Sequence, residues 1–276
     1  MKDEQHPDKE LYGDSLISLS SSDLESSRLL FVNGINHNSL FFLQQSIEKL
    51  VKAIGLDIGI IEPDRMAKIS HRPHKVYKTA TDQSNVDIAE LDKAPEIKKI
   101  LTDQDGFSDY MEKLKTATLF FIEQHKYDFE YLDEEEFSEI LGALEYIATN
   151  SESMEIDYKE YCKLMLEIFS TDSSWSRSEL NLEDFELKMK SVLEIEVDLS
   201  KINSILLWLA LITQKHQDAV RYPCKCCGES PLVNYNLETP IVKYFVNIFN
   251  LQMHCLTKYS EIRMRIKKLS IADEEE

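Results

Sequence analysis

The sequence predicts an all-α protein built as a helical bundle. Glycine and proline each occur only seven times among 276 residues, which is too few for the many tight turns of a β-rich fold. Apolar residues instead recur at helical spacing in several long segments. An apolar content of 43% in a chain of this length is sufficient for a sizeable core.

The charge balance restricts the expected partners. The chain has 31 basic and 50 acidic residues and a formal net charge of −19. Nucleic acids and anionic membranes need a positive surface, so neither is expected as a partner. No run of apolar residues is long enough to insert into a membrane, and the polar N-terminus has no signal core. We therefore expect a cytoplasmic protein, with a nuclear one not excluded, that binds a basic or helical segment of a protein partner.

Composition divides the chain into five segments with different expected roles. The first is rich in serine and has little apolar periodicity, which favours a flexible arm with serines open to phosphorylation. The expected segments are a flexible arm at 1–38, an N-terminal helical region with a loop-rich linker at 39–106, an EF-hand-like helical core at 107–217, a cysteine-containing helical segment at 218–269, and an acidic tail at 270–276.

The first predicted core helix begins near Asn38 and Ser39, which are good N-caps, and ends at Gly55. A basic cluster follows the helix. It indicates either a phosphate or acidic-partner site, or a linker that balances an acidic neighbourhood. Its members are Lys68, His71, Arg72, His74, Lys75 and Lys78.

A helix is also predicted from Asp133 to Ala148, with Glu136 at the capping-box position. The loop after it matches the second half of an EF-hand, since Glu160 falls at position 12 and Asp157 at position 9. Thr149 stands at position 1, where calcium needs a carboxylate, and a methionine replaces the glycine at position 6. We expect an EF-hand-like structural unit in which calcium binding is unlikely; a plain helix-loop-helix is the alternative.

The pattern of apolar residues between Leu180 and Ile212 predicts two more helices. One carries apolar residues from Leu180 to Val192 and Leu193, and the other is the nearly continuous apolar run from Ile202 to Ile212 around Trp208. An apolar run this short is typical of a helix buried in a bundle rather than of a membrane span.

Cys224 and Cys227 form a Cys-x-x-Cys pair followed by glycine, a spacing at which two thiolates can bind one zinc ion. Cys255 follows His254 further along. A competing interpretation begins a helix at Thr239, which places Cys255 on an apolar core face and leaves the cysteine pair as a loop without metal.

The order of these parts resembles the EF-hand and ZZ zinc-finger module of the dystrophin and dystrobrevin family over roughly residues 107–255. The Trp208-Leu209-Ala210-Leu211 run is similar to the helix that precedes the finger in that family, and the cysteine pair to the opening of the finger. The resemblance implies a single structural zinc site. Its candidate ligands are Cys224, Cys227 and Cys255, with His254 or Cys226 as the fourth.

No glycine-rich phosphate loop, nucleophile elbow or zinc-protease motif occurs in the sequence. We therefore expect no catalytic residues and a non-catalytic adaptor or scaffold. The alternatives are a regulatory subunit of an enzyme such as a protein phosphatase, and an enzyme without a recognisable motif.

Overall fold

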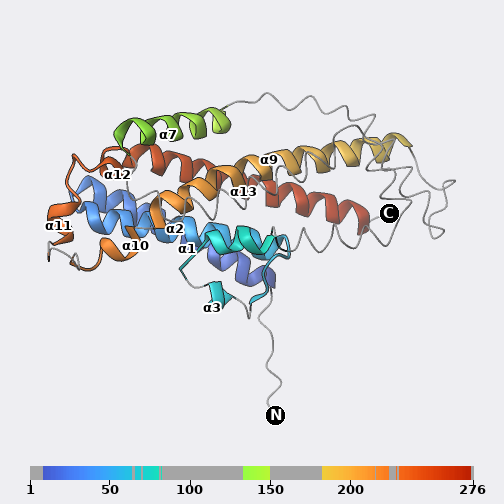
Figure 1. Cartoon of the computed structure of the whole chain (residues 1–276). Helices are drawn as coiled ribbons and strands as arrows, with labels where there is room; N and C mark the ends of the chain where they lie inside the picture. The colour runs from blue at the N-terminus through green and yellow to red at the C-terminus, as the bar shows by residue number, and fades with distance from the viewer. Residues whose placement is uncertain are drawn as a thin grey trace, which may run out of the picture.

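A computed structural model describes residues 9–63, 66–69, 71–80, 82, 133–149, 182–214, 216–223, 228 and 230–274. All regular elements among these residues are helices, and they contain no β-strand. The prediction of an all-α fold is confirmed. Long helices pack side by side in an elongated bundle (Figure 1).

The first two helices form an antiparallel hairpin. Helix α1 (Lys9–Val32) ends at a tight turn, and α2 (Asn36–Asp57) returns along it. Gly34 has a φ of 74°, a left-handed conformation that costs glycine little. Its amide bonds to the carbonyl of Phe31, and the amide of Ile35 bonds to that of Leu30, both at 2.9 Å. This pair of bonds is a Schellman motif, which satisfies the carbonyls at the end of α1.

Small polar residues line the contact between α1 and α2. The Oγ of Ser20 donates a 2.8 Å hydrogen bond to the carbonyl of Ser46, and Ser27 does the same to Ser39 at 2.8 Å. Leu24, on the same face of α1, is also buried. The serines therefore satisfy their own hydroxyls while the two backbones approach each other.

The expectation of a flexible arm at 1–38 is therefore wrong for the described part of that range. Residues 9–32 are helical and pack along α2. Serine content misled the prediction because a serine can be buried when a backbone carbonyl of a neighbouring helix accepts its proton.

Two long helices cover α2 from the other side. They are α9 (Leu182–Gln214) and α13 (Phe245–Glu274), which run side by side in opposite directions (Figure 1). Three short helices connect them. These are α10 (His216–Ala219), α11 (Pro231–Asn234) and α12 (Pro240–Lys243). The two helices predicted between Leu180 and Ile212 are thus parts of one helix, α9, from Leu182 onward.

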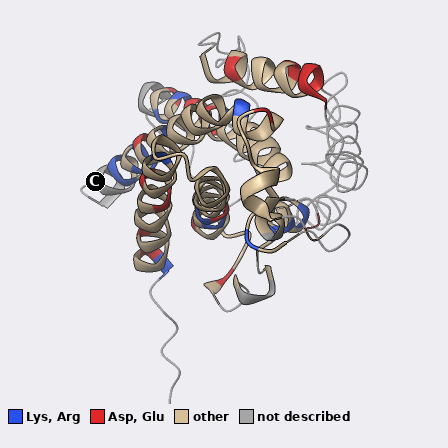
Figure 2. Cartoon of the chain, turned by 90° about the vertical axis from the view of Figure 1, so that its left-hand side faces the viewer, with Lys and Arg blue, Asp and Glu red and all other residues tan. Residues whose placement is uncertain are grey.

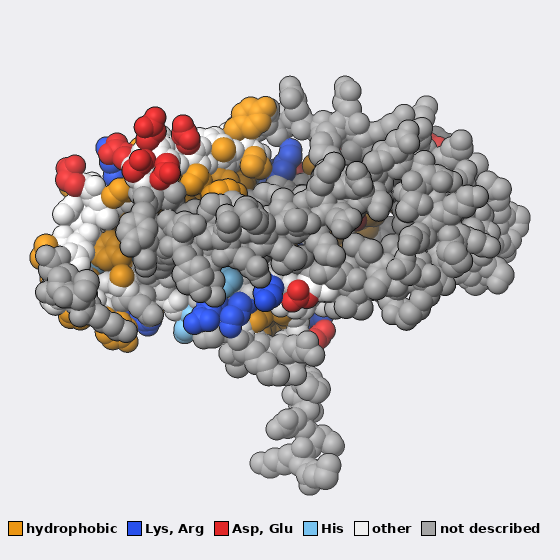
Figure 3. Space-filling model, viewed as in Figure 1, with side chains coloured by type: hydrophobic (Ala, Val, Ile, Leu, Met, Phe, Trp, Pro, Cys, Tyr) orange, Lys and Arg blue, Asp and Glu red, His pale blue; other side chains and the backbone are white. Residues whose placement is uncertain are grey.

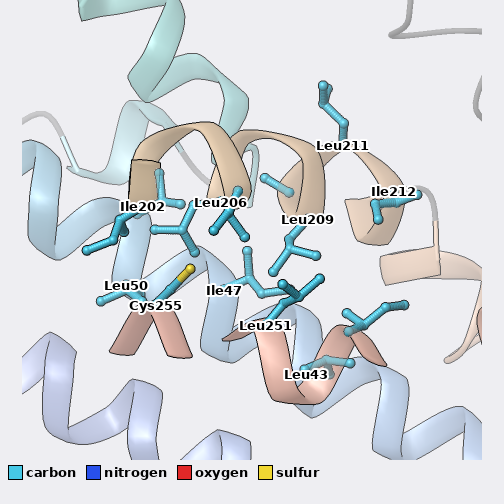
Figure 4. Close-up of a cluster of buried hydrophobic side chains, with 14 of the residues drawn as sticks. Leu43, Ile47, Leu50, Ile202, Leu206, Leu209, Leu211, Ile212, Leu251 and Cys255 are labelled. Carbon is cyan, nitrogen blue, oxygen red and sulfur yellow. The ribbon is translucent and has the colours of Figure 1, made fainter. Parts of the chain in front are cut away.

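The core lies where α2, α9 and α13 meet. Figure 4 shows leucines and isoleucines of these helices pointing toward one another, with the sulfur of Cys255 among them. Burial of each such side chain stabilises the fold by about 1.5–3 kcal/mol. Trp208, which was expected to be buried, is only partly covered. The labelled members of this cluster that are almost fully buried are Leu43, Ile47, Leu50, Ile202, Leu206, Leu209, Ile212, Leu251 and Cys255.

Helix α7 (Glu134–Thr149) packs on the outside of α9 and α13. Its start confirms the predicted capping box: Glu136 N donates to Oδ1 of Asp133 at 2.9 Å, and Asp133 N to Oε2 of Glu136 at 3.1 Å. The ring of Phe137 stacks on Tyr244, with centroids 5.6 Å apart. Figure 2 shows acidic residues at both ends of this helix.

No described helix combines the length and the apolar character that crossing a membrane would require.

Candidate functional site

The basic cluster of the sequence lies against the C-terminal half of α2. It spans α3 (Met66–Ile69) and a helical segment at 74–80. Val76 is buried beside Gly55, where an added Cβ would lie only 2.6 Å from its Cγ1. Gly55 was predicted to end the first core helix, but it lies inside α2, and its lack of a side chain makes room for this contact.

His71 and Glu48 form the central pair of the site. The Nδ1 atom of His71 lies 3.2 Å from Oε2 of Glu48. The Glu48 side chain is 5% exposed, whereas that of His71 is 57% exposed. A buried carboxylate thus holds one nitrogen of a ring that is open to solvent on its other side.

The second oxygen of Glu48 faces a cation. Oε1 accepts a hydrogen bond from Nζ of Lys52 at 2.8 Å. The side-chain amides of Gln44 and Gln45 lie 3.3 Å and 3.4 Å from Oε2. A buried carboxylate is costly unless it is paired and hydrogen-bonded. These contacts therefore account for Glu48 remaining in the interior of α2.

His74 has a different role from His71. It is buried, and its Nδ1 bonds to Oε1 of Gln214 at the end of α9. This bond ties the segment that carries His71 to a helix 140 residues away in sequence. The same segment therefore presents one histidine to solvent and anchors itself with the other.

Positive side chains lie next to the exposed histidine. Arg72 and Lys78 are exposed and Lys75 is half-buried. None of the three makes an ion pair with a carboxylate of the described residues. Figure 3 shows a row of Lys and Arg side chains with histidine at its edge on this face.

The arrangement suits acid–base chemistry on a phosphate group. Hydrogen bonding at Nδ1 fixes the ring orientation and leaves Nε2 as the nitrogen for a ligand. The neighbouring cations would attract an anion such as a phosphodiester. His71 and Glu48 lie at ion-pair distance from each other.

The structure contradicts the predicted zinc site at Cys255. Cys255 is fully buried among hydrophobic side chains (Figure 4), and burial raises the pKa of its thiol. His254 is partly buried on α13, and desolvation together with Lys258 lowers its pKa. No cluster of three or more potential metal ligands occurs in the part of the chain that is described. The prediction of Cys255 as a zinc ligand was therefore wrong, because this residue follows the helical period of a core face. The other predicted ligands, Cys224, Cys226 and Cys227, lie outside the described residues.

The EF-hand prediction placed Thr149 at the first position of a calcium loop. Thr149 is the last residue of α7, and its Oγ1 donates to the carbonyl of Glu145 at 2.8 Å. Its hydroxyl is therefore hydrogen-bonded to the backbone of the helix. The candidate calcium ligands Asp157 and Glu160 lie outside the described residues.

Glu48 was missed at the sequence level, although a signal was present. Gln44, Glu48 and Lys52 recur every four residues along the predicted helix. That spacing places three polar groups on one side of α2. A row of polar side chains among the many buried apolar residues of α2 is a sign of a site.

One comparison with known proteins gives a match. The model of the HEPN domain matches residues 14–154, more than half of the chain. Neither the curated proteins nor the solved structures gave a match. The match replaces the resemblance to the dystrophin and dystrobrevin module, and with it the EF-hand adaptor function, which was wrong. HEPN domains are frequently ribonucleases, which conflicts with the expectation of a non-catalytic protein. The matched range contains most of α1, all of α2 and the segment that carries His71, and the chain belongs to the HEPN domain family.

Proposed function

We propose that this chain is a ribonuclease that cleaves a phosphodiester bond at His71. The observation that carries the proposal is the exposed imidazole of His71 held by the buried carboxylate of Glu48. Domains of this family often act as ribonucleases or bind nucleotides. The proposal develops the alternative of an enzyme without a recognisable sequence motif.

His71 acts as the general base. Its Nε2 takes the proton of a ribose 2′-hydroxyl, and the 2′-oxygen attacks the adjacent phosphorus. The bond from phosphorus to the 5′-oxygen breaks, and the departing oxygen takes a proton from water. The products are a 2′,3′-cyclic phosphate and a 5′-hydroxyl, with no net oxidation or reduction. A positioned base of this kind typically contributes about 10²–10⁴-fold to the rate.

Glu48 is a positioning residue in this scheme. Its Oε2 accepts the Nδ1 proton of His71 and stabilises the imidazolium that forms when the base is protonated. Lys52 compensates the buried negative charge through Oε1. The pair remains aligned because α2 and the 71–80 segment are both anchored in the core.

The proposal departs from the prediction that no nucleic acid is bound. That prediction relied on the net charge of −19. Charges further apart than about 8 Å are largely screened at physiological ionic strength. From Arg65 to Lys78 the sequence has five basic residues, two histidines and no acidic residue, and the Glu48 carboxylate beside His71 is paired with Lys52, so the cations around His71 would attract an anion.

Cleavage of a fluorescent, unstructured RNA oligonucleotide by the purified full chain tests the proposal. We expect His71→Gln to lower the rate at least about 100-fold. His37→Gln, a histidine substitution at the other end of α2, should leave the rate unchanged. The same oligonucleotide with 2′-deoxyribose at the cleaved position should resist, because it lacks the attacking oxygen.

Two results would refute the proposal. Cleavage by His71→Gln at the wild-type rate would show that another group, or a contaminating enzyme, is the source. If the RNA binds measurably but stays intact at every protein concentration tried, the chain would be a nucleotide-binding domain without ribonuclease activity.

A further inference from the structure

We infer that Arg72, Lys75 and Lys78 form a phosphate-binding row that holds the RNA backbone beside the bond cleaved at His71. The inference rests on the proposed function and extends it. It assigns a binding subsite to side chains that have no part in proton transfer, and it makes the ligand a single strand of several nucleotides.

The helical segment at 74–80 has two faces. His74 and Val76 are buried, and the first of them contacts Gln214. Arg72, Lys75 and Lys78 are turned away from the core to different extents. Packing of the buried face thus orients the opposite face of the segment toward solvent. The cations on that face need no rearrangement to bind a ligand.

The three cations are spaced by three residues each, with Arg72 just before the helical segment 74–80. The amide of Lys75 bonds to the carbonyl of Arg72 at 2.9 Å, and the chain continues as a helix through residue 80. Residues three apart on a helix are neighbours on its surface. At a rise of 1.5 Å per residue, the row from Arg72 to Lys78 extends about 9 Å.

That length corresponds to several phosphates of one strand. A nucleic-acid strand has a phosphate about every 3.4 Å along a helical axis, so a row of about 9 Å faces roughly three of them. One row of cations matches the single phosphate backbone of a single strand, whereas a duplex presents two phosphate backbones. A mononucleotide would reach only the His71 end of the row.

The charges of the row are available to a ligand. The basic side chains of α13 are mostly committed to carboxylates: Arg263 pairs with Asp57 at 2.8 Å, and Arg265 pairs with Asp198 at 2.8 Å. Arg72, Lys75 and Lys78 make no such pair among the described residues. In a chain with 50 acidic residues, three neighbouring cations that make no ion pair with a described carboxylate are an unusual feature.

Fluorescence anisotropy with the full chain measures the row directly. The probes are labelled RNA of one, three, six and twelve nucleotides whose cleavable positions carry 2′-O-methyl groups. We expect affinity to rise at least about tenfold from one nucleotide to six and then to level off. For the six-nucleotide probe, the double variant Lys75→Gln/Lys78→Gln should reduce the slope of log affinity against log salt by about 1.4, since each single-strand contact contributes about 0.7.

The matched control is Lys258→Gln/Lys268→Gln, which removes the same charge from α13. It should retain the wild-type slope. Three results would each contradict the phosphate-binding row. They are equal affinity for one and six nucleotides, equal salt slopes for the two double variants, and tighter binding of a six-base-pair duplex than of the single strand. These readings are of binding alone. A chain that binds as expected but does not cleave RNA would therefore sink the proposed ribonuclease and leave the row intact.

Discussion

The hydroxyl of Tyr259 on α13 donates a hydrogen bond to Oδ2 of Asp57, the last residue of α2. The Nε of Arg263 lies 2.8 Å from the same oxygen, and its guanidinium also bonds to Asp14 on α1. The guanidinium of Arg263 therefore joins three helices, α1 through Asp14, α2 through Asp57, and its own helix α13. Burial raises the pKa of Tyr259, so its hydroxyl remains a donor throughout the ordinary pH range.

Removal of that donor should weaken the bundle. In Tyr259→Phe, the ring still fills its buried site but Asp57 loses one partner. Hydrogen bonds to charged groups contribute about 1.5–3 kcal/mol, so we expect a loss of about 2 kcal/mol in the free energy of unfolding by urea. The exposed Tyr222→Phe should change it by less than about 0.5 kcal/mol. Equal effects of the two variants would contradict the assigned role.

Two helical glycines should respond in opposite ways to alanine. Alanine favours a helix interior by about 0.5–1 kcal/mol over glycine. At Gly142 in α7 an added Cβ meets nothing within 4 Å, so Gly142→Ala should stabilise by that amount. At Gly13 in α1 the Cβ would lie 2.7 Å from Oδ1 of Asp57, which Tyr259 and Arg263 hold in place. Gly13→Ala should therefore destabilise. Thermal unfolding of both variants measures whether each substitution raises or lowers the stability of the fold. If both substitutions stabilise the fold, Asp57 can move aside.

Cys255 should be inert in the folded protein. The thiolate is the reactive form of cysteine, and burial raises the pKa of this thiol. Iodoacetamide applied to the native chain should leave Cys255 unmodified, as mapped by peptide mass spectrometry, and should label it in urea. Cys255→Ser should cost more than Cys255→Ala, because it buries a hydroxyl among leucines. Rapid native labelling would contradict its place in the core.

Acidification should destabilise the fold through His254. Desolvation and Lys258 lower its folded pKa below the usual 6.5. Between the folded value and 6.5 the unfolded chain binds more protons, so the free energy of unfolding falls as pH is lowered through that interval. In urea unfolding at pH 7.5 and 5.5, His254→Gln should lose less stability than the wild type. If both proteins lose the same unfolding free energy between pH 7.5 and 5.5, groups other than His254 cause the loss.

Local patterns predicted much of the fold. The capping box of Asp133 and Glu136, and the buried run of α9 from Ile202, follow from residues close together in sequence. Helix α1 was missed, because the partners of Ser20 and Ser27 are carbonyls of another helix. Burial of a serine depends on such a partner, which a count of serines cannot reveal.

The candidate site was less predictable from the sequence, because it too depends on a partner on another helix. His71 belongs to a cluster that the sequence marks as basic, but its chemistry comes from Glu48, 23 residues earlier and on a different element. The zinc prediction failed in the opposite way. Cys224 and Cys255 are similar in type, but the helical period of α13 directs Cys255 into the core.

The enclosure of α2 by α9 and α13 has a consequence for the newly made protein. Leu43, Ile47 and Leu50 leave the ribosome early, but α13, which covers them, begins only at Phe245. At about 5–20 residues per second, the nascent hairpin waits on the order of ten to forty seconds with an apolar face uncovered. During biosynthesis the α1–α2 hairpin therefore exposes an apolar face to which a chaperone could bind.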